Sequence, residues 1–145
     1  MSAYIHSPER RASERKATQV KTVLLVEDSD IERKVIRLAI ESFTSFRVCE
    51  ATNGIEGIKI AKDVKPDLIV LDLAMPQMSG LEAAMVLKNT MPKVPIVVLT
   101  LYADEITVRS AAFGVSKVLS KTDGLGPLLD CLRKMLASRT AQAKD

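Results

Sequence analysis

The chain has 145 residues, of which 47% are hydrophobic and only 3% are aromatic. This length fits one domain with a sizeable core, and the composition excludes a disordered chain, so aliphatic side chains must fill the interior. The formal net charge of +3 lies entirely in the first 21 residues, and the remainder of the chain is neutral. A short basic arm of this kind is more often a solvated terminus than a surface for nucleic acid or membrane.

Residues 1–20 are polar, charged and aperiodic, and we expect a disordered basic tail there. The two cysteines, Cys49 and Cys131, have no metal-ligand spacing and are expected to be buried thiols in a reducing compartment. No stretch resembles a signal peptide, and the longest apolar runs are too short to span a bilayer. The sequence therefore predicts a cytoplasmic protein without a membrane partner.

From Lys21 onward, strand-like and helix-like segments alternate. The predicted strands are Thr22–Val26, Phe46–Ala51, Leu68–Leu71, Ile96–Leu99 and Lys117–Leu119. These runs are rich in Val, Ile and Leu and mostly continuous, which is typical of parallel strands covered on both faces. Five strands alternating with five helices predict an α/β fold with a parallel sheet and right-handed crossovers.

Two of the predicted helices have a capping-box spacing at their start, Ser29 with Glu32 and Ser79 with Glu82. The residues expected on the inward face of the first helix are Ile31, Val35, Leu38, Ala39 and Ser42. A second helix begins at Asn53, and its expected inward residues are Ile55, Ile58 and Ala61.

The fourth and fifth predicted helices follow the fourth and fifth strands. Residues 103–113 form the fourth, and Gly114 ends it. The fifth runs from Gly124 to Ala137. Its expected inward residues are Leu125, Leu128, Leu129, Leu132 and Leu136.

Polar side chains follow four of the predicted strands. Glu27 and Asp28 come directly after the first strand, Asp72 after the third, Thr100 after the fourth, and Lys121 two residues after the fifth. Functional groups of an open parallel sheet gather at the carboxyl ends of its strands, beside the topological switch point. If these strands are neighbours, the five side chains converge on one site.

Three carboxylates in one cleft repel one another and need a cation or protons. Few protein ligands, all of them oxygens, suit Mg²⁺ with water completing its octahedron, and Lys121 would supply a second positive charge. Each of these residues taken singly is better explained as a helix cap or a surface charge. Their joint occurrence at four strand ends is much harder to explain in that way.

These residues make the chain resemble the receiver domains of response regulators in two-component signalling, over about residues 21–138. The matching segments are Glu27–Asp28 after VLLV, Asp72 after DLIVL, the loop MPQMSG, Thr100 after PIVVL and Lys121 after KVLS. The resemblance implies a flavodoxin-like fold: a doubly wound five-stranded parallel sheet in the order 2-1-3-4-5, flanked by five helices. It also implies a phospho-accepting receiver rather than an enzyme that turns over a substrate.

The resemblance assigns a role to each site residue. Asp72 would take a phosphoryl group from a phosphohistidine. Asp28, Asp72 and the backbone carbonyl of Ala74 would bind Mg²⁺ directly, with Glu27 acting through water or a longer contact. Lys121 would pair with the phosphoryl oxygens, and the Thr100 hydroxyl would move to hydrogen-bond them.

The implied partners are a sensor histidine kinase or phosphotransfer protein and a downstream protein target. The target would bind the face formed by the fourth helix, fifth strand and fifth helix, which is also the face through which a homodimer would form. We expect no DNA binding by this chain, because after Ala137 only eight residues remain. The expected domains are a tail at 1–20, a receiver at 21–138 and a C-terminal tail at 139–145; whether an output domain follows in a longer protein stays open.

Val118 departs from the family pattern, which usually has Tyr or Phe three residues before the site lysine. A β-branched side chain has no ring to swing inward, so the alternative of a phosphorylation-independent interaction module remains open. Two other classes fit less well. A haloacid-dehalogenase phosphatase needs a second Asp at the position of Ala74, and a flavin carrier needs a phosphate loop where this chain has EDSD.

Overall fold

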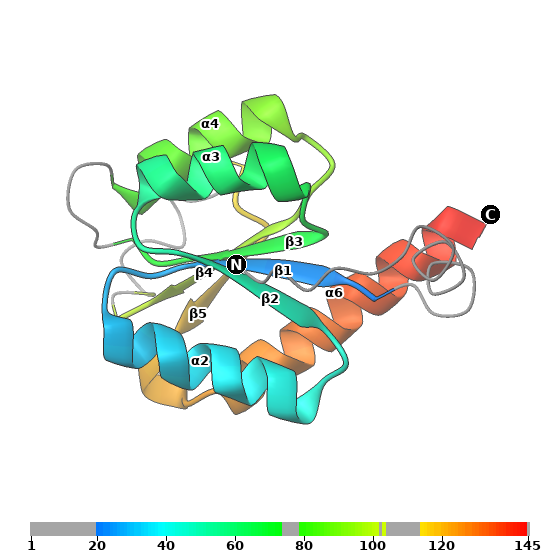
Figure 1. Cartoon of the computed structure of the whole chain (residues 1–145). Coiled ribbons are helices and arrows are strands. Elements are labelled where there is room, and N and C mark those ends of the chain that lie inside the picture. The colour runs from blue at the N-terminus through cyan, green and yellow to red at the C-terminus, as the bar shows by residue number, and fades with distance from the viewer. Residues whose placement is uncertain (1–19, 74–78, 102, 104–113, 145) are drawn as a thin grey trace, which may run out of the picture.

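The computed structural model describes residues 20–73, 79–101, 103 and 114–144. Five strands form one parallel sheet in the order β2-β1-β3-β4-β5 (Figure 1). Their bounds are β1 Thr22–Val26, β2 Arg47–Ala51, β3 Leu68–Leu71, β4 Ile96–Thr100 and β5 Lys117–Ser120. The predicted order is confirmed, and the predicted strand bounds agree to within one residue.

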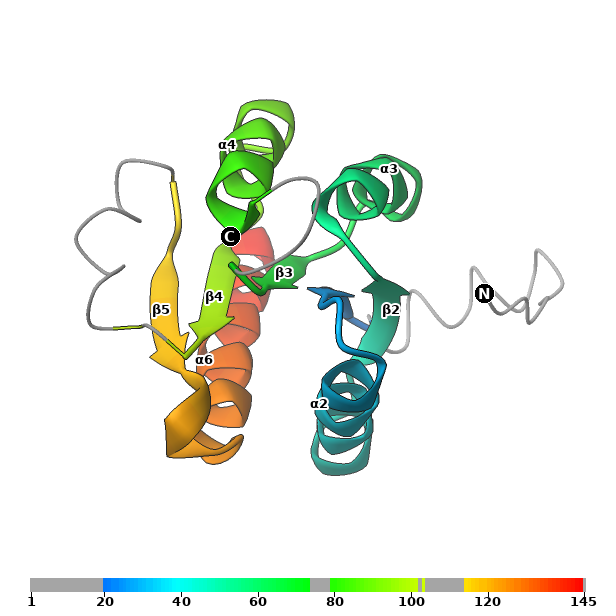
Figure 2. The same ribbon diagram turned by 90° about the vertical axis from the view of Figure 1, so that its left-hand side faces the viewer.

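The described residues contain four α-helices: α2 Asp30–Phe43, α3 Gly54–Val64, α4 Gly80–Thr90 and α6 Gly126–Lys144. Helices α2 and α6 cover one face of the sheet, and α3 and α4 cover the other (Figures 1 and 2). The predicted helix at 103–113 lies outside the described residues except for Ala103, as does the predicted tail except for Val20. The predicted division into tail, receiver and tail stays a prediction.

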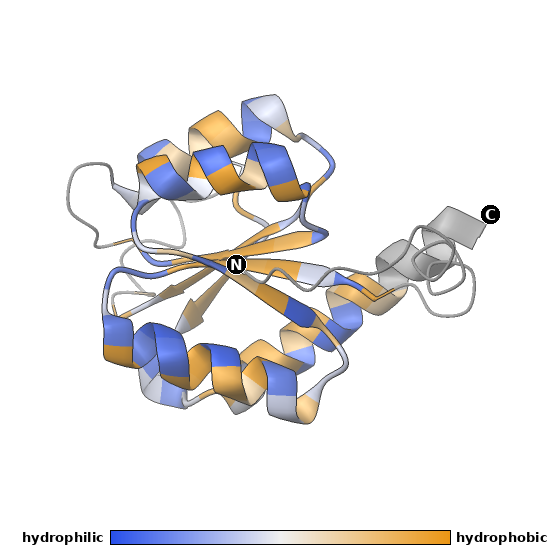
Figure 3. Ribbon diagram, viewed as in Figure 1, coloured by the Kyte–Doolittle hydropathy of each residue, from blue (hydrophilic) through white to orange (hydrophobic). Residues whose placement is uncertain are grey.

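Successive residues of each inner strand point to opposite faces of the sheet, which creates two cores. Val23 and Leu25 of β1 pack with α2 and α6, whereas Leu24 and Val26 pack with α3 and α4. Because both faces are covered, these strands are apolar throughout, while the helices carry alternating apolar and polar bands (Figure 3).

The predicted inward face of α2 is wrong. That of α3 is partly confirmed, since Ala61 is buried and Ile58 packs against the core, but Ile55 does not. Helix α2 buries Ile36 and Ile40, whereas Ile31, Val35 and Leu38 are 78%, 52% and 46% exposed. The helix has apolar residues on both sides, so periodicity alone could not choose between the two faces. In α3 the buried residues are Gly54, Gly57 and Ala61, and Ile55 is half exposed. Small residues face the sheet there; an added Cβ on Gly57 would lie 2.9 Å from a Val26 methyl carbon.

Helix α6 also departs from the prediction. It starts at Gly126 rather than Gly124 and continues to Lys144 rather than ending at Ala137, because no Gly or Pro interrupts the chain there. Leu128, Leu129, Leu132 and Leu136 are buried as predicted, and Leu125 packs against the same core while remaining partly accessible.

Both cysteines are free and partly buried rather than fully buried. Each packs at the margin of a core, Cys49 beside the α3 and α4 side and Cys131 beside the α2 and α6 side. Among the described residues, no helix combines the length and apolar character needed to cross a bilayer.

Candidate functional site

The site begins where β1 and β3 end. The backbone N–H of Glu27 donates to Ala51 at 3.1 Å, and that of Asp72 donates to Val26 at 3.1 Å. The pairing between strands thus continues one residue past each strand, which fixes both carboxylates at the same edge of the sheet. Their side chains are only 2% and 7% exposed, so the sheet holds two acids in a nearly dry position.

Thr100 and Lys121 come from the neighbouring strands. Thr100 is the last residue of β4, is 1% exposed, and is paired in register with Ser120 of β5. Lys121 follows directly and begins the short 3₁₀ helix η2, Lys121–Asp123, whose start is capped by the Ser120 hydroxyl accepting from Thr122. This turn places the Lys121 side chain beside Glu27 and Asp72, at the ends of β1 and β3.

The ammonium group of Lys121 lies among three carboxylates. Its Nζ donates to Oε1 of Glu27 at 3.0 Å and to Oε1 of Glu32 at 2.9 Å, and it lies 3.7 Å from Oδ1 of Asp72. The predicted convergence of Glu27, Asp72 and Lys121 is therefore present. Glu32, which sequence reasoning assigned only to a helix cap, is a further member of this cluster.

Glu27, Asp28 and Asp72 each present a carboxylate oxygen, and these oxygens all lie within 4.8 Å of one another. Asp28 is exposed and the other two are buried, so the group opens to solvent on one side. Three hard oxygen donors with an open side, where water can complete the shell, fit Mg²⁺ better than a softer metal.

The electrostatics of Glu27 indicate the same need for a cation. Burial, followed by the charge of Asp72, raises its pKa from 4.5 to about 7, even though Lys121 and the Ser29 N–H favour the ionised form. For Lys121, burial alone would lower the pKa, but hydrogen bonds to Glu32 and Glu27 and the charge of Asp72 outweigh it and raise the pKa above its usual range. One lysine thus incompletely offsets the acids around it.

Arg33 supports the site from outside, and sequence reasoning missed it. Its guanidinium donates to the backbone carbonyl of Glu27 at 2.9 Å and also contacts Asp30 at 2.6 Å and Glu50 at 3.2 Å. These contacts tie α2 to the loop that carries Glu27. The available signal was the position of Arg33 one turn into the helix that follows the acidic pair.

Gly80 allows α4 to start against the site. A Cβ at this position would overlap the backbone oxygen of Asp72 and lie 2.6 Å from the Cα of Leu73. The Gly80 N–H donates to the Leu73 carbonyl at 3.1 Å. Only glycine permits this close approach, which fixes the backbone that follows Asp72.

Two sequence predictions are partly or wholly untested. The backbone carbonyl of Ala74 lies outside the described residues. Val118 is paired in register with Val98 of β4 and is partly buried. Its place on β5, beside β4 and before Lys121, agrees with the position deduced from the sequence.

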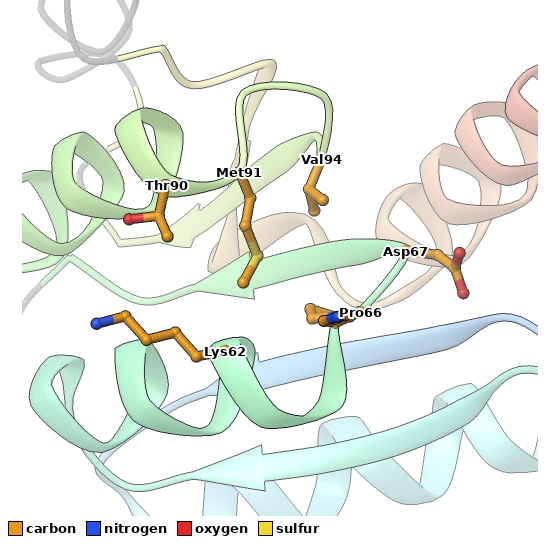
Figure 4. Close-up of a pocket in the computed structure, with 7 residues that line it drawn as sticks. Lys62, Pro66, Asp67, Thr90, Met91 and Val94 are labelled. Carbon is orange, nitrogen blue, oxygen red and sulfur yellow. The ribbon is translucent and has the colours of Figure 1, made fainter.

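A separate pocket lies at the other end of the strands (Figure 4). Its lining residues come from the end of α3, the segment between α3 and β3, the end of α4 and the segment between α4 and β4: Lys62, Lys65, Pro66, Asp67, Thr90, Met91 and Val94. Asp67 is used structurally there, since its Oδ2 accepts from the Thr22 N–H at 2.8 Å. The pocket shares no residue with the acidic site.

Three comparisons agree with this geometry. The response regulator receiver domain model matches residues 23–133. The chain is 29% identical over 121 residues to the polar-differentiation response regulator DivK of Brucella anthropi, covering 80% of this chain and 96% of DivK. The response regulator TrrA of Thermotoga maritima, solved in complex with Mg²⁺ and BeF, has 25% identity and a TM-score of 0.74, covering 80% of this chain and 99% of that one.

The chain is also 37% identical over 102 residues to a protein-glutamate methylesterase/protein-glutamine glutaminase of Pyrococcus abyssi. That match covers 68% of this chain but only 28% of the methylesterase, so it concerns a part of the relative. The family model, the sheet order and the acidic cluster agree with one another. The chain therefore belongs to the response regulator receiver domain family of two-component signalling.

Proposed function

We propose that the chain is a phospho-accepting switch in which Asp72 takes a phosphoryl group from a phosphohistidine of a sensor histidine kinase or phosphotransfer protein. The observation that carries this proposal is the nearly buried Asp72 carboxylate, within 4.8 Å of the acidic oxygens of Glu27 and Asp28 and 3.7 Å from the Lys121 ammonium. A carboxylate becomes a competent nucleophile toward phosphorus when nearby cations offset the charge of the phosphoryl oxygens.

In the proposed step, one oxygen of the Asp72 carboxylate attacks phosphorus and forms an acyl phosphate. The bond between phosphorus and the imidazole nitrogen breaks, and the bonding electron pair leaves with the imidazole, which takes up a proton. Bound Mg²⁺ would supply positive charge to the phosphoryl oxygens. Asp28, Asp72 and the Ala74 carbonyl would hold it, with Glu27 behind them.

The chain's own residues have distinct tasks in this step. Lys121 donates to the phosphoryl oxygens, and the Thr100 hydroxyl hydrogen-bonds the new group, which draws the end of β4 toward Asp72. The modification adds about −1.5 to −2 charges at this edge of the sheet. We propose that a downstream protein target, or a second copy of the chain, reads the change on the face formed by residues 103–113, β5 and α6.

Incubation with Mg²⁺ and acetyl phosphate, followed by intact mass measurement, tests this function. We expect a mass increase of one phosphoryl group in the wild type and none in Asp72→Ala. Asp63→Ala, on the exposed side of α3, is the matched control and should be modified like the wild type. An unmodified wild type would contradict the proposal, and a modified Asp72→Ala would move the acceptor elsewhere.

The outward row on α2 is where we propose that the phosphohistidine donor docks. The row consists of Ile31, Val35 and Leu38, and Ile31 follows the exposed Asp28 by three residues. Exposed apolar rows of this kind often mark binding surfaces, and a donor that reaches Asp72 must cover the rim of the site.

The double substitution Ile31→Ser with Leu38→Ser should slow phosphotransfer from a phosphorylated histidine-containing donor about tenfold, because two apolar contacts are lost. The rate with acetyl phosphate should stay at the wild-type value. Val64→Ser, an exposed apolar residue on α3, serves as the control. Equal slowing with both phosphodonors would show that the double variant damages the site rather than the docking surface.

A second candidate is an interaction module that works without phosphorylation, and Val118 is the observation that favours it. The residue lies beside β4 but has no ring that could change position with Thr100. Under this reading, partner binding would be the same for the wild type and Asp72→Ala, with or without acetyl phosphate.

A further inference from the structure

The lysine of the site has more carboxylate partners than one charge can satisfy. Nζ of Lys121 is 2.9 Å from Glu32 and 3.0 Å from Glu27, but 3.7 Å from Asp72. The ammonium group is thus held on the α2 side of the site, away from the carboxylate that would carry the phosphoryl group.

The reason that Glu32 reaches Lys121 lies in an incomplete cap on α2. The Ser29 hydroxyl accepts from the Glu32 N–H at 3.2 Å, as in a capping box. The Ser29 N–H, however, donates to Oε2 of Glu27 at 3.2 Å in place of the reciprocal bond to Glu32. The Glu32 side chain is therefore not bound in the cap and accepts a hydrogen bond from Lys121, which lies 89 residues away in the sequence.

Helix α4 provides the comparison within the same molecule. It starts with the same spacing, Ser79 and Glu82, and there both reciprocal bonds form at 3.2 Å. Equivalent glutamates thus have different partners, and the difference follows from the presence of Glu27 beside Ser29. Of these two glutamates, only Glu32 of α2 contacts Lys121.

Exposure separates the two glutamate partners of Lys121. The Glu27 side chain is 2% exposed, so loss of its contact with Lys121 would leave a buried carboxylate without its counter-ion. The Glu32 side chain is 49% exposed and can turn to water at little cost. Of the two, Glu32 is the partner that Lys121 can exchange for a phosphoryl oxygen.

We propose that Glu32 is a positioning residue that competes with the phosphoryl group for Lys121 and so slows phosphorylation of Asp72. The proposal rests on the proposed function, since it concerns the same lysine. The contact must break before Lys121 can donate to the phosphoryl oxygens. Removing it should therefore raise the phosphorylation rate about two- to fivefold, which is the range expected for one partly exposed ion pair.

The experiment compares rates of acyl phosphate formation with acetyl phosphate and Mg²⁺ for three variants. Glu32→Gln removes the charge, and Glu32→Asp keeps it but shortens the side chain by one methylene; both should react faster than the wild type. Asp30→Asn removes a charge from the same helical turn, where Asp30 pairs with Arg33, and should react at the wild-type rate. Glu32→Gln and Glu32→Asp should also bind beryllofluoride more tightly than the wild type.

Three results would overturn the proposal: a wild-type rate in Glu32→Gln, an equal acceleration in Asp30→Asn, or a wild-type rate in Glu32→Asp. The last two would mean that charge near the site, and not the contact, sets the rate. A double-mutant cycle of unfolding free energies between Glu32→Gln and Lys121→Gln reports the contact itself. The cycle could show that Glu32 and Lys121 are coupled while the wild type takes up no phosphoryl group. That result would confirm the contact but contradict both the proposed function and the slowing role of Glu32.

Discussion

At the scale of single residues, the acidic site is held together against electrostatic repulsion. Glu27 keeps a pKa of about 7 because it is buried beside Asp72, although Lys121 and a backbone N–H favour its ionised form. Between about pH 4.5 and 7 the carboxyl of Glu27 therefore holds a proton more tightly in the folded state than in the unfolded state. Ionised Glu27 therefore destabilises the fold, and a cation bound beside it would offset that cost.

The substitution Glu27→Gln should make this cost measurable. The ordinary pKa of Glu27 is 4.5 and its folded value is about 7, so the wild type loses stability as pH rises from about 4.5 to 7, whereas the glutamine side chain of the variant does not titrate. Relative to the wild type, the variant should gain on the order of 2 kcal/mol between pH 5 and pH 8. Urea unfolding in EDTA at the two pH values measures the gain, with Glu41→Gln on α2 as control.

Mg²⁺ should reduce the gain, because the cation restores the benefit of the ionised glutamate. A variant and a wild type whose unfolding free energies change in parallel between pH 5 and pH 8 would show that Glu27 titrates normally.

The glycine at the start of α4 gives a steric prediction. Gly80→Ala places a methyl group against the backbone oxygen of Asp72 and the Cα of Leu73, and neither of these backbone atoms can move without shifting Asp72. We expect a loss of about 1–3 kcal/mol in unfolding free energy and a phosphorylation rate reduced at least severalfold. Gly126→Ala is the matched control, because no heavy atom of the described residues lies within 4 Å of its added Cβ. If both variants react with acetyl phosphate like the wild type, the close approach has no role in the chemistry.

At the scale of elements, helix α2 has one buried and one exposed row of apolar residues. The inner row, Ile36 and Ile40, packs under the sheet, and the outer row is exposed. Ile40→Ala should cost about 2–4 kcal/mol, because it leaves a cavity beside β1. Val35→Ala in the outer row should cost less than about 0.5 kcal/mol. Thermal and urea unfolding of the pair measure the difference, and equal losses would contradict the assignment of the rows.

The sequence was sufficient for the sheet and for most of the site. Continuous apolar runs specify buried parallel strands, and the strand order implied by the family resemblance brings Glu27, Asp72 and Lys121 to one edge. It was insufficient for the facing of α2, because apolar residues line both sides of that helix. The sequence was also insufficient to predict the Glu32 contact with Lys121. The direction of the Glu32 side chain depends on whether the Ser29 N–H donates to Glu32 or to Glu27, and only the structure shows that it donates to Glu27.

At the scale of the whole molecule, the site and the fold are coupled. Two cores lie on opposite faces of one sheet, and the acids extend the central strands β1 and β3. A cation that binds only the folded site must stabilise the entire domain by linkage.

Mg²⁺ should therefore raise the unfolding temperature. At a concentration 100 times its dissociation constant, the expected stabilisation is about 2.7 kcal/mol. Asp28→Asn combined with Asp72→Asn should abolish the increase, whereas Asp63→Asn should retain it. Differential scanning calorimetry with and without Mg²⁺ measures these shifts. The same increase in the double variant would place the cation outside the acidic cluster.

Because the final helix is long, a small tilt at its start would displace its far end by a larger distance. Helix α6 begins five residues after Lys121, just beyond Gly124, whose φ is 78°, and runs for 19 residues. Such a helix is about 28 Å long, so a tilt of about 5° at its first turn moves its far end by about 2.5 Å. That end lies at the opposite side of the molecule from the carboxyl ends of β1 and β3 (Figure 1). A small change in the turn that carries Lys121 would therefore produce its largest displacement at the C-terminal end of α6.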